Sequence, residues 1–182
     1  WKGRVALHSS GALTSDELAV LRKGGAAVAS VHPLMTFVRG SQPGLAGVPF
    51  ALEGDAAAVR LARRIVQKIG GQSYSIRKNH KAAYHAWGTF ASPLITALLA
   101  TTEQVAALAG VNRKVAKRRM IPILLQTLVN YAASGAPGAF SGPIVRGDVA
   151  TVNSHLVVLR DLPAARDAVS YTHLRAHETG RN

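Results

Sequence analysis

Three side chains suited to proton transfer and substrate orientation follow one another in the segment 79–99. Lys81 and His85 are four residues apart, and Ser92 lies seven residues beyond His85. A helix would carry all three on one face. A lysine or a histidine can donate a proton to a reacting oxygen or nitrogen, and a serine hydroxyl can orient a substrate. We therefore predict Lys81, His85 and Ser92 as catalytic residues beside a cleft.

The alternative for this segment is a packing helix with an exposed first turn. Most surface lysines and histidines have no specific role, and a helical serine can bond back to a carbonyl. A neighbouring stripe is predicted to pack; it consists of Ala82, Ala86, Phe90 and Leu94. Pro93 removes a backbone hydrogen bond and disfavours helical geometry at the preceding residue, so we expect a kink or break there.

Short strands alternate with helices before residue 79. We predict strands at 4–8, 26–31, 48–52 and 72–76. One helix begins after Thr14, and an amphipathic helix capped by Asp55 separates the third and fourth strands. A loop rich in glycine and proline, without a helical pattern, separates the second and third. This alternation predicts a mainly parallel α/β sheet over residues 1–78.

Polar clusters follow the first two predicted strands. His8, Ser9, Ser10 and Gly11 come after the first, and His32 comes after the second. Ligands of parallel sheets lie beyond the carboxyl ends of the strands, and small residues allow a cofactor to approach the backbone. We predict these five residues as cofactor-binding. The alternative is an ordinary turn with a capping serine.

Residues 79–168 are predicted to form an all-helical domain. Its helices are expected at 79–99, 102–109, 112–133 and from 148 or 149 to 159, with Thr101 or Thr102 and Asn112 as caps. Arg146 and Asp148 stand at the end of a loop dense in glycine and proline. An arginine there can neutralise a substrate carboxylate, so we predict both as substrate-binding. The alternative is a structural loop in which Asp148 only caps the last helix.

Composition narrows the function classes. There are no cysteines, which excludes disulfides and thiolate metal sites, and we predict no metal site. Lys and Arg number 22 against 9 Asp and Glu, and the densest basic cluster spans 113–119. A nucleic-acid patch is one interpretation. The solvated face of a helix is favoured, because no nucleic-acid-binding motif accompanies the cluster. No apolar run reaches the length of a membrane span, and we expect a cytoplasmic protein.

The C-terminal residues are predicted to be foreign to the natural protein. The string VSYTHLRAHET at 169–179 resembles the translation of a transposase-type sequencing adapter. We therefore set 169–182 aside from fold reasoning. The absence of an initiator Met leads us to expect a fragment.

Several strings together resemble one family. They are HSSGAL, SVHPLMTF, EGD, KAAYHAWGTFAS, LVNYAASG and FSGPIVRGD. Over nearly all of 3–160 the chain resembles the Rossmann-like proteins with the C-terminal domain of unknown function 2520. That family is similar to pyrroline-5-carboxylate reductase, 6-phosphogluconate dehydrogenase and ketopantoate reductase.

The resemblance implies a fold, a cofactor and a partner. The fold is α/β followed by all-α: the truncated C-terminal half of a Rossmann-like parallel sheet, then a helical domain like that of 6-phosphogluconate dehydrogenase. The implied activity is an NAD(P)-dependent oxidoreductase with a small-molecule substrate, homodimeric through the helical domain.

Two features depart from the pattern. The sequence has no G-x-G-x-x-G turn. Ser92-Pro93 also stands where many related dehydrogenases carry an asparagine. The alternative function is a non-catalytic ligand sensor or dimerisation module.

Overall fold

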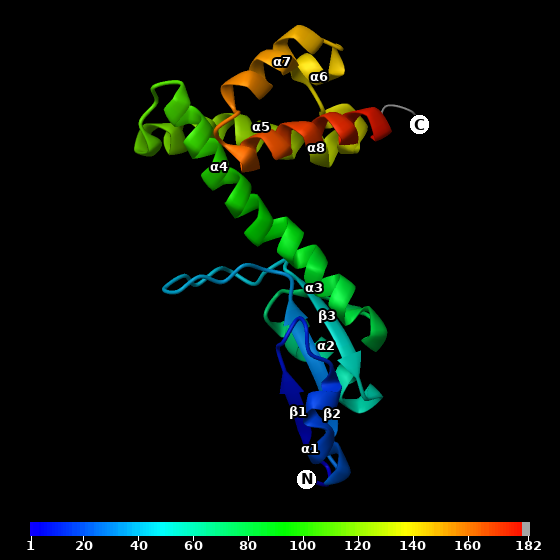
Figure 1. The fold of residues 1–182 in the computed structure, drawn as a ribbon. Coiled ribbons are helices and arrows are strands. Elements are labelled where there is room, and N and C mark those ends of the chain that lie inside the picture. Colours follow the sequence, from blue (N-terminus) through cyan, green and yellow to red (C-terminus); the bar gives the residue numbers. More distant parts are fainter. Residues whose placement is uncertain (180–182) are drawn as a thin grey trace. The chain divides into compact units, whose positions relative to one another are not determined.

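The computed structural model describes residues 1–179, which form two compact units (Figure 1). The first is Trp1–Ile95 and the second begins at Thr96. Strands end at Ser75, and the described chain after that residue is helical, as predicted for residues beyond 78. The first unit nevertheless extends past the predicted boundary, because the helix that follows residue 80 packs on the sheet through its side chains.

Four strands form a single sheet in the order β1-β2-β3-β4. They are β1 (Val5–His8), β2 (Ala27–Pro33), β3 (Pro49–Gly54) and β4 (Gln72–Ser75). The β1–β2 and β3–β4 pairs are parallel, but β2 and β3 are antiparallel. The sheet is therefore mainly parallel, as predicted, with an antiparallel pair at its centre that was not predicted. The connection 34–48 contains no helix to carry the chain back across the sheet, and parallel neighbours need such a crossover.

One face of the sheet holds the apolar core of this unit. The helix α2 (Ala56–Lys68) covers it, and Figure 1 shows α2 lying against the strands. Val48, Phe50 and Leu52 pack there with Ala62 and Val66. The inward face predicted for α2 is confirmed at Val59, Ala62 and Val66, but the predicted Ile65 and Ile69 are exposed.

The predicted cap of α2 is wrong in its chemistry. Asp55 occupies the N-cap position without a side-chain capping bond. Its carboxylate instead accepts hydrogen bonds from the backbone N–H of Val28 at 2.9 Å and from Nε of Arg22 at 3.1 Å. Asp55 therefore ties the start of α2 to β2 and to the preceding helix.

The first helical segment is split in two. It consists of η1 (Ser15–Leu18), a 3-10 turn, and α1 (Ala19–Lys23). Thr14 caps η1, accepting from the N–H of Asp16. This segment and the loop before it place residues 8–15 against the second face of the sheet.

A long helical run begins directly after β4. It comprises η2 (Lys78–His80), α3 (Lys81–Thr89), a π-helical turn η3 (Phe90–Leu94) and α4 (Ile95–Leu108). Pro93 lies in the π-turn, so the expected distortion at this proline is confirmed. The predicted break near residue 100 is wrong: Thr101 and Thr102 cap nothing and donate to the carbonyls of Ala97 and Leu98.

Besides most of α4, the second unit contains four further helices within the described residues. They are α5 (Arg113–Ala139), α6 (Gly142–Val145), α7 (Val149–Val158) and α8 (Pro163–Thr179). Asn112 caps α5 as predicted, accepting from the N–H of Lys114. Gly135, with φ of 64°, breaks α5.

The adapter-like segment continues α8 through Thr179, and Leu174 within it is exposed. Residues 180–182 of that segment lie outside the described part. The assignment of 169–182 to an adapter stays a prediction.

No single helix within residues 1–179 is long and apolar enough to span a membrane. Two segments that meet at a sharp bend of 117°, Lys78–Leu108 and Arg113–Val145, satisfy the length and composition criteria only as a pair.

Candidate functional site

The second face of the sheet is polar where β2 crosses it. Side chains alternate between the two faces of a strand, so Val31 points toward the α2 side while Ser30 and His32 point away from it. Ser30 pairs with Glu53 in the antiparallel register of β2 and β3, which places both side chains on this face. The candidate site is built on this face.

Lys81 is buried on this face, with only 2% of its surface exposed. Its ammonium donates to the hydroxyl of Ser30 at 2.6 Å and to the carbonyl of Ser10 at 2.7 Å. The Ser30 hydroxyl also donates to that carbonyl at 3.2 Å. Lys81 therefore fastens the loop after β1 to the middle of β2.

A buried carboxylate lies near this ammonium. Glu53 accepts from the backbone N–H of Ser15 at 2.6 Å and from its hydroxyl at 2.9 Å, and Glu53 and Ser15 are both buried. Burial lowers the pKa of Lys81, and the charge of Glu53 opposes that shift. This arrangement holds η1 on the sheet.

The helix α3 runs along β2 with matched contacts. Lys81 bonds Ser30, and three residues later the Tyr84 hydroxyl lies 2.7 Å from Nδ1 of His32. One turn further on, a Cβ added at Gly88 would lie 3.5 Å from Leu34. The packing stripe of α3 is therefore Lys81, Tyr84 and Gly88. The predicted stripe is wrong, since its members Ala82, Ala86, Phe90 and Leu94 are exposed.

Gly11, His32 and His85 meet at the carboxyl ends of β1 and β2. A Cβ at Gly11 would stand 2.7 Å from Nε2 of His32 and 2.9 Å from Cδ2 of His85. Such distances are shorter than real Cβ contacts, so a side chain at this position would require His32 or His85 to shift. The structure thus brings together three residues predicted from the sequence: Gly11 in the loop, His32 at the strand end and His85 on the helix.

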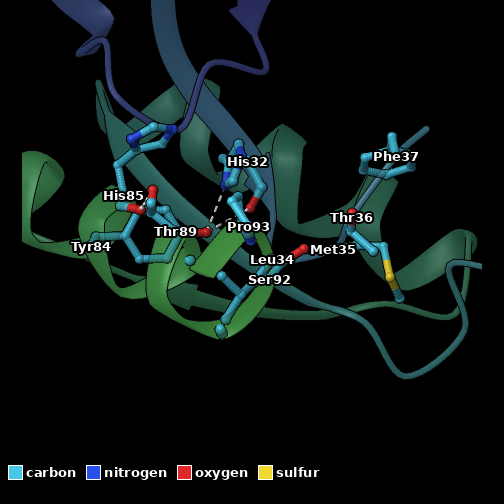
Figure 2. Close-up of a pocket in the computed structure, with 12 residues that line it drawn as sticks. His32, Leu34, Met35, Thr36, Phe37, Tyr84, His85, Thr89, Ser92 and Pro93 are labelled. Carbon is cyan, nitrogen blue, oxygen red and sulfur yellow. Dashed lines mark hydrogen bonds between the residues drawn. The ribbon is translucent and has the colours of Figure 1, made fainter. Parts of the chain in front are cut away.

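A cavity of about 430 Å³ opens beside these histidines (Figure 2). Its polar lining comes from His32, Tyr84, His85, Thr89 and Ser92. Its apolar lining comes from Leu34, Met35, Phe37, Gly88, Ala91 and Pro93, with Thr36 between them. Figure 2 shows the 35–37 segment across the cavity from His85 and Tyr84. The lining contains no carboxylate, lysine or arginine, so the histidines are its side chains that titrate near neutral pH.

The electrostatics of this cavity favour a neutral His32. Burial lowers the pKa of His32, and the positive charge of Lys81 and the nearby His85 lower it further. Burial, followed by the neighbouring Tyr74, raises the pKa of the Tyr84 phenol far above its ordinary value. At neutral pH the pair consists of an uncharged imidazole and a protonated phenol.

Three of the predicted cofactor residues shape the loop after β1. The Nε2 atom of His8 lies 2.9 Å from the carbonyl of Thr14, and its Nδ1 accepts from the N–H of Ser10. The Ser10 hydroxyl accepts from the N–H of Leu13, and Ser9 is exposed. None of the three lines the cavity. Their predicted role in cofactor binding stays a prediction.

The two predicted substrate residues lie in the second unit. Asp148 accepts from the N–H and the hydroxyl of Thr151, and these bonds lower its pKa. It therefore caps α7, as the structural alternative stated. Arg146 is exposed near it. The binding role of both stays a prediction.

Sequence reasoning missed Ser30, Tyr84 and Glu53. The alternation Ser30-Val31-His32 was a usable signal, because it places both polar side chains on one face of β2. The spacing of Tyr84 from Lys81 was a second one. No local signal marks Glu53, whose partner Ser15 is 38 residues away.

The strand ends, the helix that crosses them and the helical second unit define a Rossmann-like fold followed by a helical domain. The sequence profile of the domain of unknown function DUF2520 matches residues 48–177. The chain therefore belongs to the DUF2520 family. No curated protein sequence matches the chain.

Solved structures share this fold. Protein BF3122 from Bacteroides fragilis is 18% identical with a TM-score of 0.79, over 96% of this chain and 65% of that one. Protein TM1727 from Thermotoga maritima is 23% identical with a TM-score of 0.77, over 97% and 68%. Pyrroline carboxylate reductase from Plasmodium falciparum, solved with NADP bound, is 13% identical with a TM-score of 0.61, over 97% and 71%. The present chain thus spans about two thirds of the length of these proteins.

Proposed function

We propose that the chain is part of a cytoplasmic NAD(P)-dependent oxidoreductase that acts on a small carbonyl or imine compound. The observation that carries this proposal is the meeting of Gly11, His32 and His85 at the ends of β1 and β2, beside a cavity of about 430 Å³. Ligands of Rossmann-like sheets bind at such strand ends. The likeness to a reductase that holds NADP gives further support.

The described residues fit the nicotinamide end of such a cofactor. The cavity has apolar walls and a few polar groups on one side, as binding sites for flat organic rings do. Gly11 does not line the cavity but lies against the rings of His32 and His85, which do. We propose that Gly11 and His32 flank the nicotinamide and that Ser10, held by Lys81, keeps the loop in place. The cofactor would supply or accept the hydride.

The polar groups on α3 and η3 face the same cavity. We propose that His85 and Ser92 contact the reacting group of the substrate, as their helical spacing suggested. Lys81 contributes by positioning, because its ammonium already bonds Ser10 and Ser30. Arg146 and Asp148 remain candidates for the distal end of the substrate.

NMR titration of the chain with reduced nicotinamide mononucleotide tests this proposal. The amide signals of Gly11 and His32 should shift, while that of Lys68, exposed at the end of α2, should not. Adenosine 2′,5′-bisphosphate, which lacks the nicotinamide, is the matched control ligand and should leave Gly11 unshifted. Shifts confined to other regions, or none at millimolar ligand, would overturn the nicotinamide assignment.

A turnover assay distinguishes an enzyme from the alternative function, a non-catalytic ligand sensor. The chain together with any segment that precedes it in its gene should oxidise NADPH in the presence of a panel of cyclic imines and ketones. Nicotinamide-dependent shifts without turnover by any panel member would favour the sensor.

We further propose a homodimer formed through the helical unit. The helix α5 exposes many large apolar side chains: Ile121, Ile123, Leu125, Leu128, Val129 and Tyr131. Apolar surface of this extent is typical of protein interfaces. Light scattering should give a dimer mass for the chain and a monomer mass for a Leu125→Glu, Leu128→Glu variant. A monomeric parent chain would contradict the proposal.

A further inference from the structure

The contact between Tyr84 and His32 determines which imidazole nitrogen carries the proton. Nδ1 of His32 lies 2.7 Å from the Tyr84 oxygen, and the Tyr84 hydroxyl also donates to the backbone carbonyl of His32 at a longer 3.4 Å. The rings meet edge to face, with centroids 5.4 Å apart and an interplanar angle of 86°. A single tyrosine thus contacts both the ring and the backbone of one histidine.

Both contacts are satisfied together by one arrangement of protons. The phenol has a single hydrogen, which its raised pKa retains at neutral pH. If that hydrogen points at the His32 carbonyl, the phenol oxygen is free to accept from Nδ1–H. If it points at Nδ1 instead, the carbonyl loses this contact with Tyr84. Between Tyr84 and His32 alone, the first arrangement makes two contacts and the second makes one, which favours the first.

Nε2 of His32 then has a lone pair and no hydrogen. This nitrogen faces the close approach of Gly11 and His85 at the strand ends, and His32 lines the cavity. Within residues 1–179, the ring of His32 is hydrogen-bonded through Nδ1 and not through Nε2. A ligand would reach this lone pair through the part of the cavity wall that His32 forms.

We propose that His32 exchanges the substrate proton through Nε2, and that Tyr84 is the positioning residue that keeps this nitrogen unprotonated at rest. The assignment rests on the proposed function for its hydride partner. In oxidation, the O–H or N–H bond of the substrate breaks and its proton joins Nε2. A bound oxidised nicotinamide would accept the hydride from the adjacent carbon as the carbon–heteroatom double bond forms, and His32 would be left as imidazolium. Reduction runs through the reverse steps and returns the proton from Nε2.

The remaining lining supports this choice. The cavity has no carboxylate or lysine to act as base, and the Lys81 ammonium is held by Ser10 and Ser30. Of the two histidines, His85 is exposed and His32 is half-buried with a fixed ring. A base with a defined tautomer and orientation is the better proton acceptor.

Long-range proton–nitrogen NMR correlation of the histidine rings tests the tautomer directly. In the full chain above pH 7, His32 should show a protonated Nδ1 and an unprotonated Nε2, whereas free histidine prefers hydrogen on Nε2. Tyr84→Phe keeps the ring packing and removes the hydroxyl, so His32 should revert to the ordinary tautomer. Tyr131→Phe, which changes an exposed tyrosine of α5, is the matched control and should leave His32 unaltered.

The outcomes separate this inference from the proposed function. A His32 ring with hydrogen on Nε2 in the parent chain, or an unaltered tautomer in Tyr84→Phe, would overturn the inference. Neither result would affect the nicotinamide titration, which tests the proposed function. The expected tautomer in the parent chain, together with its reversal in Tyr84→Phe, supports it. If Tyr84→Phe does not fold, the tautomer of the parent chain alone decides.

Discussion

Replacing Lys81 by methionine should destabilise the first unit. The ammonium makes two buried hydrogen bonds, to Ser30 and to the carbonyl of Ser10, and bonds from a charged donor contribute about 1.5–3 kcal/mol each. The Ser30 hydroxyl keeps its own bond to Ser10, and methionine avoids the cost of burying a charge. On balance, we expect the free energy of unfolding to fall by about 2–4 kcal/mol.

Urea unfolding monitored by tryptophan fluorescence measures this change. Both tryptophans of the chain, Trp1 and Trp87, lie in the first unit, so the signal reports on the right part of the protein. Lys68→Met, at an exposed position of α2, is the matched control and should change stability by less than about 0.5 kcal/mol.

A double-mutant cycle with Ser30→Ala attributes the loss to the proposed contact. Lys81→Met and Ser30→Ala remove the two ends of the same bond, so their effects should be non-additive by at least about 0.5 kcal/mol. A Lys81→Met variant as stable as Lys68→Met, or strictly additive effects, would refute the view that Lys81 fastens the loop after β1 to β2.

Three further perturbations test other parts of the structure. Because the pKa of His32 lies below its ordinary 6.5, the unfolded chain binds this proton first as pH falls, and the free energy of unfolding should decline below about pH 6.5. His32→Gln should remove the contribution of His32 to this pH dependence. His155→Gln, at an exposed position of α7, should leave it unchanged. Gly11→Ala should lower the free energy of unfolding by about 1–3 kcal/mol, because the new methyl group would clash with His32 and His85. Gly44→Ala should not lower it, because a Cβ there would have no atom within 4 Å. Asp148→Ala should accelerate amide hydrogen exchange in the first turn of α7, because Thr151 loses its capping acceptor; unchanged exchange would mean that the cap is not needed.

Local patterns in the sequence account for most of the elements. The amphipathic repeat of α2 and the caps Asn112 and Asp148 were predictable because each depends on neighbours within a few residues. The antiparallel orientation of β3 was not predicted, although its signal was present. The connection 34–48 has no helical repeat, and a chain without a crossover helix returns antiparallel.

The site was predictable only where residues share an element or follow a strand end. His32, His85 and Gly11 were found because strand ends and helical spacing converge in this fold class. The burial of Lys81 was not found, because Ser10 and Ser30 are 71 and 51 residues away from it in sequence. Contacts over such separations follow from the packing of α3 on β2, and no periodic pattern encodes them.

The geometry of α3 on β2 also favours a positioning role for Lys81 over the predicted catalytic role. A strand advances about 3.3 Å per residue, so Leu34 at the cavity lies about 13 Å beyond Ser30 along β2. A helix advances about 1.5 Å per residue, so Gly88, which faces Leu34, lies about 10.5 Å beyond Lys81. Because the helix advances less than the strand over this stretch, the Lys81 side chain has to reach back toward Ser30. An ammonium anchored there cannot also reach a substrate beside Leu34, whereas His32 is one strand repeat closer to the cavity. The long side chain of Lys81 therefore holds α3 on β2, which leaves the proposed proton exchange to His32.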